Sequence, residues 1–238
     1  MGLLWRICSS LLALALVAAA AAVSGQVTLQ DSKEPGVRKS KDFSGVVVWL
    51  EPLKGPVSLP APAVHTMLQK GKKFIPQVMV IPTGATVNFP NADPIFHNAF
   101  SNFSGQPFDT GLYAPGTSQK VTFRREGIVR VFCNIHSTMS AVIVVVRTPH
   151  FARTGRDGSF RMESVPPGEY QLKIWHERAS EEKLKALERT ITVGAEDIAL
   201  PVVSISESGY LEVPHLNKCG KEYPEREPDH VIYPGGRK

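Results

Sequence analysis

The feature that most constrains this chain is a series of short, β-branched segments, each of which ends at a turn. Six of them cover residues 64–69, 77–81, 86–89, 120–123, 128–132 and 141–147. Gly and Pro, 19 of each among 238 residues, supply the turns between them. Val129, Val131 and Cys133 share one face of their segment, and this period of two is typical of a half-buried strand. Many short strands with such turns predict an all-β fold, a sandwich or a barrel.

A second block of strands follows in residues 149–206. Residues 155–160 and 166–168 form turns, residues 170–175 alternate as a strand, and residues 190–193 and 198–205 close the block. Residues 179–188 are a charged segment with helical spacing, or else a long polar loop. Because the block is small for an independent core, we expect the surplus strand at residues 43–50 to pair with its strands.

The amino terminus predicts the compartment. A short charged start, an apolar run over residues 11–23 and the small residues Ser24 and Gly25 are typical of a secretory leader, here residues 1–25. The apolar run is shorter than the roughly 20 residues of a spanning helix, which favours cleavage near residues 22–26 over an uncleaved anchor. No later segment is apolar enough to span a membrane. The sequence therefore predicts a periplasmic or secreted protein.

Three further segments complete the predicted organisation. Residues 26–62 form an N-terminal segment, in which residues 27–42 are polar and are expected to be a linker or an edge. Residues 63–148 form the first β domain, and residues 207–238 form a tail rich in Pro, Gly and charge. We expect that tail to be extended along the surface or disordered. A net charge of +5 without a dense basic run argues against nucleic-acid binding. We also expect the protein to be a monomer.

Four residues carry the chemistry: His97, Cys133, His136 and Met139. The last three lie in one loop between two apolar segments, and His97 follows an upstream strand. Two imidazoles, a thiolate and a thioether form the ligand set of a blue-copper site, with a weak axial Met. Thiolate and thioether favour Cu(I) and imidazole accepts both oxidation states, so the set suits one copper that cycles between Cu(I) and Cu(II).

Other interpretations of these residues are weaker. Zinc is the main rival metal, but Met is a poor zinc ligand and the loop holds no fourth Cys, His or carboxylate. A disulfide between Cys133 and Cys219 would consume the thiolate, and we expect Cys219 to be free. The remaining histidines show no partner spacing and are expected to be solvated or packing residues; they are His65, His150, His176, His215 and His230.

The segment from residue 74 to residue 139 resembles a cupredoxin of the plastocyanin and amicyanin type. The resemblance rests on FIPQVMVIPTGATVNFPNAD, on HN at His97 and Asn98, and on CNIHSTM. It implies a Greek-key β-barrel or sandwich in which Asn98 ties the first-His loop to the thiolate loop, and in which His136 lies near the surface as the electron gateway. GRDGSFRMESVPPGEYQLKIWH resembles a carboxypeptidase-regulatory-like segment, which implies a small transthyretin-like β-sandwich.

These features predict a single-electron carrier that accepts electrons from one redox protein and passes them to another. The alternative is a copper-binding surface or interaction protein with little redox traffic. An enzyme is not expected, because the sequence holds no His-x-His, Gly-x-Ser-x-Gly, His-Glu-x-x-His or phosphate-loop motif.

Overall fold

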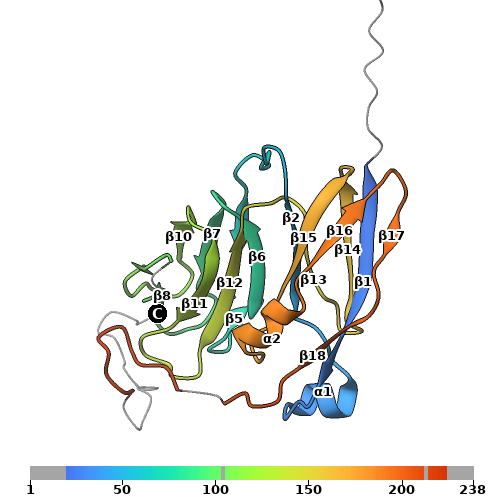
Figure 1. The fold of residues 1–238 in the computed structure, drawn as a ribbon. Coiled ribbons are helices and arrows are strands. Elements are labelled where there is room, and N and C mark those ends of the chain that lie inside the picture. The colour runs from blue at the N-terminus through green and yellow to red at the C-terminus, as the bar shows by residue number, and fades with distance from the viewer. Residues whose placement is uncertain (1–19, 103–104, 212–213, 224–238) are drawn as a thin grey trace, which may run out of the picture.

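The structure is a computed structural model that describes residues 20–102, 105–211 and 214–223 (Figure 1). Strands and their irregular connections account for almost all of these residues, and the two helices among them are short: α1 (Pro35–Ser40) and α2 (Glu181–Ala186). The all-β class is therefore confirmed. Most of the predicted leader, residues 1–19, lies outside the described residues. Within the described part of the chain, no helix has the length and apolar character that a membrane span requires.

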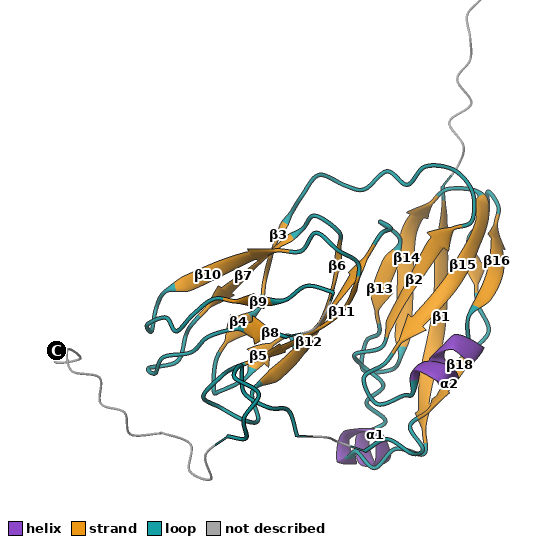
Figure 2. Ribbon diagram, turned by 60° about the vertical axis from the view of Figure 1, so that its left-hand side comes forward, coloured by secondary structure: helices purple, strands orange, loops and turns teal. Residues whose placement is uncertain are grey.

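The first domain packs two sheets face to face (Figure 2). One has the strand order β10-β7-β3 and the other β6-β12-β11-β8-β9, and β4 pairs with β5 beside them. The predicted strand at residues 64–69 is divided between β3 and β4. The strands are β3 (Val64–Thr66), β4 (Leu68–Gln69), β5 (Phe74–Ile75), β6 (Val78–Pro82), β7 (Thr86–Pro90), β8 (Phe100–Ser101), β9 (Phe108–Asp109), β10 (Ser118–Thr122), β11 (Gly127–Phe132) and β12 (Ser140–Val146).

The second domain is also built from two sheets. One has the order β14-β1-β17, with β18 also pairing with β1, and the other has the order β13-β2-β15-β16. The strands are β1 (Ala21–Gln30), β2 (Val47–Pro52), β13 (Phe151–Arg153), β14 (Ser159–Val165), β15 (Gly168–Trp175), β16 (Arg189–Val193), β17 (Ile198–Ala199) and β18 (Val203–Ser206). The helix α2 lies where residues 179–188 predicted one; it begins after Ser180, whose side chain caps the amide of Lys183.

The strand predicted at residues 43–50 belongs to the second domain, as expected from the small size of that block. β2 lies between β13 and β15, and Leu50 is opposite Leu172. Both leucines are fully buried. The antiparallel pairing supplies the apolar surface that residues 149–206 lack on their own.

The prediction of a linker or edge at residues 27–42 is wrong for residues 27–30. β1 runs through Gln30 and is central in its sheet, pairing antiparallel with β14 and parallel with β17 and β18. Val27 and Leu29 are buried, Thr28 between them is half-buried, and Gln26 and Gln30 are exposed, so the strand has a period of two within a polar-looking stretch. β1 also begins at Ala21, inside the predicted leader, and Ala21 and Val23 are buried.

β12 joins the cores of the two domains. Ala141, Ile143 and Val145 lie in the apolar cluster of the first domain, together with Cys133 and Met139. The alternate residues of the same strand, the valines Val142, Val144 and Val146, lie in the cluster of the second domain. A strand that is buried on both faces has a continuous apolar sequence, as β12 does.

Candidate metal centre

The loop that joins β11 to β12 carries three of the four predicted ligands. Its first and last residues are tied together, because the amide of Cys133 donates to the carbonyl of Met139 over 3.1 Å. The amide of Met139 donates to the carbonyl of His136, also over 3.1 Å. These two bonds close the seven-residue sequence CNIHSTM into a compact turn. The side chains of Cys133 and His136 therefore reach the same point.

His97 reaches that point from the segment that connects the two sheets of the first domain. It lies between β7 and β8, and its backbone pairs with Tyr113: the Tyr113 amide donates to the His97 carbonyl over 2.9 Å. Tyr113 is held in turn, since its hydroxyl donates to the carbonyl of Phe89 over 2.8 Å. Burial raises the pKa of Tyr113 far above its usual range. His97 is thus fixed by backbone pairing and is fully buried.

The three strong donor atoms have the spacing that a shared metal ion requires. The Cys133 Sγ lies 3.7 Å from the His97 Nδ1 and 3.6 Å from the His136 Nδ1. Metal–sulfur and metal–imidazole bonds of about 2.3 and 2.0 Å, at angles between tetrahedral and trigonal, give S–N separations of about 3.5 to 3.7 Å. All three residues are buried, and their donor atoms lie within 4.8 Å of one another. The site therefore fits one ion bound by all three side chains.

An acidic residue that sequence reasoning missed sets the tautomer of His97. The Asp93 Oδ2 lies 2.8 Å from the His97 Nε2, so Nε2 carries the proton and Nδ1 is free to bind a metal. Burial lowers the pKa of His97, which keeps the ring neutral. Burial acts to raise the pKa of Asp93, but the amides of Lys72 and Gly71 and the His97 ring outweigh it and hold that pKa below its usual value.

Met139 is fully buried in the same apolar cluster as Cys133. It lies at the end of the ligand loop, and its role as a weak axial ligand stays a prediction. A thioether in a dry apolar shell, beside a thiolate and two imidazoles, makes the donor set soft. That set fits copper better than a hard cation.

Asn98 occupies the position that the resemblance implied for it. Its side-chain carbonyl accepts from the amide of Asn134 over 2.7 Å, which joins the His97 connection to the thiolate loop. Its amide group donates to the Asp109 Oδ1 over 3.1 Å. The two ligand-bearing segments are therefore coupled through one buried side chain.

The expectation that His136 lies at the surface is wrong. Only 1% of this residue is exposed. Its ring packs edge-on against His97, with the ring centroids 4.8 Å apart. The imidazole that was expected to be the gateway is enclosed in the domain.

The cysteines and the remaining histidines agree with the sequence interpretation where they are described. Neither Cys133 nor Cys219 forms a disulfide; the first is buried and the second is exposed. His176 is a buried packing residue whose Nε2 lies 2.8 Å from Glu207. His215 packs against Phe132, and His230 lies outside the described residues.

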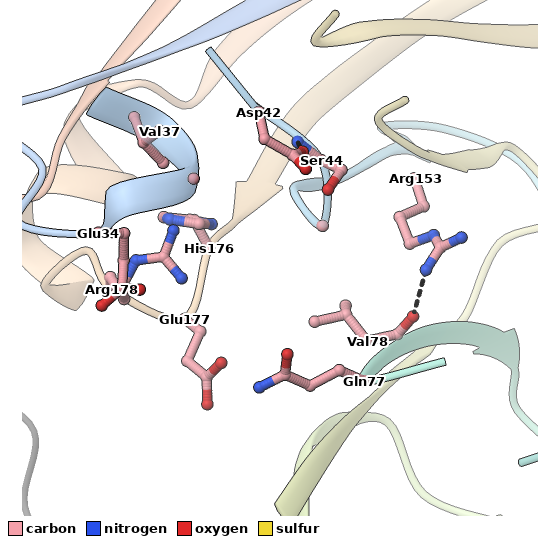
Figure 3. A pocket seen from close by; sticks show the side chains of 12 residues that line it. Glu34, Val37, Asp42, Ser44, Gln77, Val78, Arg153, His176, Glu177 and Arg178 are labelled. Carbon is pink, nitrogen blue, oxygen red and sulfur yellow. Dashed lines mark hydrogen bonds between the residues drawn. The ribbon is translucent and has the colours of Figure 1, made fainter. Parts of the chain in front are cut away.

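A separate cavity of about 250 Å³ lies where the two domains meet, between α1, the start of β6 and the end of β15 (Figure 3). Two of its polar side chains are already engaged. Arg153 donates to the carbonyl of Val78 over 3.0 Å, and Arg178 donates to Glu207 over 3.0 Å. None of the predicted ligands lines this cavity. It is distinct from the metal centre.

Solved structures with similar folds include copper proteins. A purple cupredoxin from Nitrosopumilus maritimus is 23% identical, and the match covers 34% of this chain and 99% of that one, with a TM-score of 0.33. An oxidised methionine-to-leucine mutant of amicyanin is 16% identical over 34% of this chain and 81% of that one, with a TM-score of 0.33. The copper-containing nitrite reductase of Thermus scotoductus is 24% identical over 50% of this chain and 28% of that one, with a TM-score of 0.34.

These similarities concern the fold of part of the chain. The chain spans only about a quarter of the nitrite reductase, given the 28% coverage. No family model and no curated protein matches the sequence. The chemistry of the site follows from its own side chains.

Proposed function

We propose that the protein is a single-electron carrier that holds one type 1 copper ion through His97, Cys133, His136 and Met139. The observation that carries the proposal is the buried triangle of one Sγ and two Nδ1 atoms, with S–N separations of 3.7 and 3.6 Å. Copper bound there would supply a one-electron couple between Cu(I) and Cu(II). The protein supplies geometry, a dry shell and a fixed tautomer.

The chain's own groups favour electron transfer with little rearrangement. His97 is fixed by its backbone pairing with Tyr113 and by Asp93, and the thiolate loop is closed by its own backbone bonds. A site that keeps the same donors in both oxidation states reorganises little when the electron arrives or leaves. Its burial also excludes water, which would otherwise bind the metal.

The partners in this proposal are a donor and an acceptor redox protein, and the carrier is a monomer that performs no chemical turnover. The predicted leader places it in the periplasm or outside the cell. The second candidate is a copper-binding interaction protein with little redox traffic, which the β-rich second domain favours, since such a domain offers a docking surface. Stopped-flow reduction and reoxidation separates the two: a carrier cycles rapidly without losing its metal.

The visible spectrum of the copper-loaded, oxidised protein tests the site directly. We expect an intense thiolate-to-copper charge-transfer band that is abolished in Cys133→Ser, because the thiolate is the donor of that transition. Cys219→Ser is the matched control and should keep the band, since Cys219 is exposed and lies outside the triangle. Met139→Gln should keep copper and shift its potential, because an axial ligand tunes more than it holds. Absence of the band from the wild-type protein would contradict the proposal.

A further inference from the structure

The chain after β18 returns to the first domain (Figure 1), where residues 214–223 contact the ligand loop. We call residues 214–223 the strap. It has its own local structure: the amide of Asn217 donates to the carbonyl of Lys221 over 2.8 Å, and the amide of Gly220 donates back to the carbonyl of Asn217 over 2.9 Å. Gly220 has a φ of 72°, which glycine adopts without strain. Of the two expectations for the tail, disorder is wrong for these residues, which lie against the first domain with a turn of their own.

The strap binds the backbone of the thiolate residue itself. The Tyr223 hydroxyl donates to the carbonyl of Cys133 over 2.7 Å. The amide of Cys133 is already bonded to Met139, so both polar groups of this residue's backbone have partners.

A second contact joins the strap to the Asn98 network. The amide of Lys218 donates to the Asn134 Oδ1 over 3.0 Å, and its ammonium group lies 2.6 Å from the Asp109 Oδ2. Asp109 accepts from Asn98 through its other oxygen, and Asn98 holds the amide of Asn134. Lys218 therefore closes a ring of polar contacts that passes through Asn134, the second residue of the ligand loop.

A third contact is aromatic. The ring of His215 stacks on Phe132, the residue before the thiolate, with the centroids 3.9 Å apart and the planes at 26°. Tyr223 meets His215 edge-on at 5.2 Å, and its hydroxyl lies 3.3 Å from the His215 Nδ1. Two strap rings thus pack together over the end of β11.

We propose that the strap is a clamp on the thiolate loop and that Tyr223 is its positioning residue. Three independent contacts converge on Phe132, Cys133 and Asn134, which form one side of the metal centre. The clamp stabilises the loop before any metal binds, and it occupies the surface that leads to the Cys133 backbone. Its role in holding copper rests on the proposed function, whereas its effect on the loop does not.

Amide hydrogen exchange of the full-length, metal-free protein tests the clamp without copper. The hydroxyl of Tyr223 contributes one hydrogen bond to a buried carbonyl. Tyr223→Phe should therefore speed the exchange of the amides of residues 133–139 about five- to tenfold. Tyr223→Ala should speed it further, because the ring packing is lost as well. Lys218→Met should act on the same amides through the lost contact with Asp109.

The control for these variants is Cys219→Ser, which changes an exposed strap residue and should leave the loop amides unchanged. The amides of β15, in the second domain, report that each variant is folded. Unchanged loop exchange in both Tyr223→Ala and Lys218→Met would overturn the clamp.

The same variants in the copper-loaded protein give a second readout. A clamped loop should release copper to a chelator more slowly than a loop whose anchor is removed. Tyr223→Phe should therefore release copper about five- to tenfold faster, with the charge-transfer band retained. If the wild-type protein forms no such band, but the loop amides exchange faster in Tyr223→Phe than in the wild type, the result would contradict the proposed function and support the clamp. A band with unchanged loop exchange and unchanged release would support the carrier and overturn the clamp.

Discussion

At the scale of single residues, the candidate metal centre depends on a carboxylate that contacts the far side of the His97 ring. Asp93 is held by the amides of Gly71 and Lys72, at 2.6 and 2.8 Å, and it holds His97 in turn. A carboxylate behind an imidazole raises its basicity and fixes its orientation. The strength with which His97 would bind a metal thus depends on a turn that lies 22 and 21 residues before Asp93.

Replacing Asp93 with Asn should weaken copper binding about tenfold, at the lower end of what such partners contribute, because the amide keeps a hydrogen bond but loses the charge. A competition titration against a chelator measures the change. Asp42→Asn is the control. The pKa of Asp42 is also lowered, first by its hydrogen bond with Ser44. Asp42 lies in the loop between α1 and β2, away from the ligand residues. Equal affinity for copper in the Asp93 variant and the wild type would contradict this role.

Glu207 should stabilise the second domain above the pH at which a free carboxyl titrates. It is 4% exposed, and although burial acts to raise its pKa, bonds from His176, Arg178 and Ser32 lower it from 4.5 to about 2. A depressed folded pKa adds stability that is present above pH 4.5 and is lost as the pH falls toward about 2. Glu207→Gln should therefore lower the free energy of unfolding at pH 7 by about 2 to 3 kcal/mol.

Denaturant unfolding of Glu207→Gln and of the wild type, at pH 7 and near pH 3, measures this contribution. The difference between the two proteins should shrink at the lower pH. Glu196→Gln, an exposed residue of the same domain, should show no difference at either pH. A deficit in Glu207→Gln that grows as the pH falls would contradict the assignment.

The spacing of the donor residues was enough to predict that His97, Cys133 and His136 lie together, because the last two share one short loop whose ends are fixed by strands. The axial role of Met139 stays a prediction. Asp93 was missed, although a carboxylate four residues before His97 is a local signal that could have indicated it. The burial of His136 had no such signal. It depends on how the folded loops enclose the ring, and a sequence spacing carries no information on enclosure.

At the scale of elements, β1 shows how far the described fold reaches into the predicted leader. Ala21 is opposite Val165 and Val23 is opposite Met162. The amide of Ala22 donates to the Asp197 Oδ1 over 2.7 Å. Cleavage near residues 22–26 would remove these contacts. We therefore expect the processed chain to begin at or before Ala21.

The intact mass of the exported protein measures this boundary. A chain that begins at Gln26 should also unfold at a lower temperature than one that begins at Ala20, because the lost burial of Val23 alone is worth about 2 kcal/mol. An exported chain that begins at Gln26 and is as stable as the longer one would contradict the expected boundary.

The elements most easily predicted were those with an uninterrupted apolar or alternating pattern, such as β11 and β12. β1 was missed because its visible part, residues 27–30, is short and polar on one face, and its remaining residues look like the end of an apolar leader. β8, β9 and β17 have two residues each, too few to show any period. The strap was missed because its contacts join residues about 90 positions apart, as Tyr223 and Cys133 do at a separation of 90.

At the scale of the whole molecule, the two domains should unfold together. Their clusters meet on the two faces of β12, so loss of one exposes the other. Trp49 and Trp175 lie in β2 and β15 of the second domain, whereas the copper ligands lie in the first. Tryptophan fluorescence and the copper band should therefore report one common midpoint on heating.

Val144→Ala should lower both midpoints equally, by an amount that corresponds to about 2 kcal/mol, because it leaves a cavity where the two domains meet. Val202→Ala is the control, since Val202 is 57% exposed. Two separate transitions, with only the fluorescence shifted in Val144→Ala, would contradict a shared core.

The chain order has a mechanical consequence. β2 and β13 are paired neighbours in one sheet, with Trp49 opposite Phe151, yet the entire first domain is inserted between them. Two adjacent strands, β2 and β13, therefore connect the first domain to the second, and the returning tail contacts the first domain at a third place. A domain on a single flexible linker can swing between two partners, whereas a domain that is held at three places cannot. For the proposed carrier, this arrangement predicts that each redox partner docks on the protein and leaves before the next one arrives.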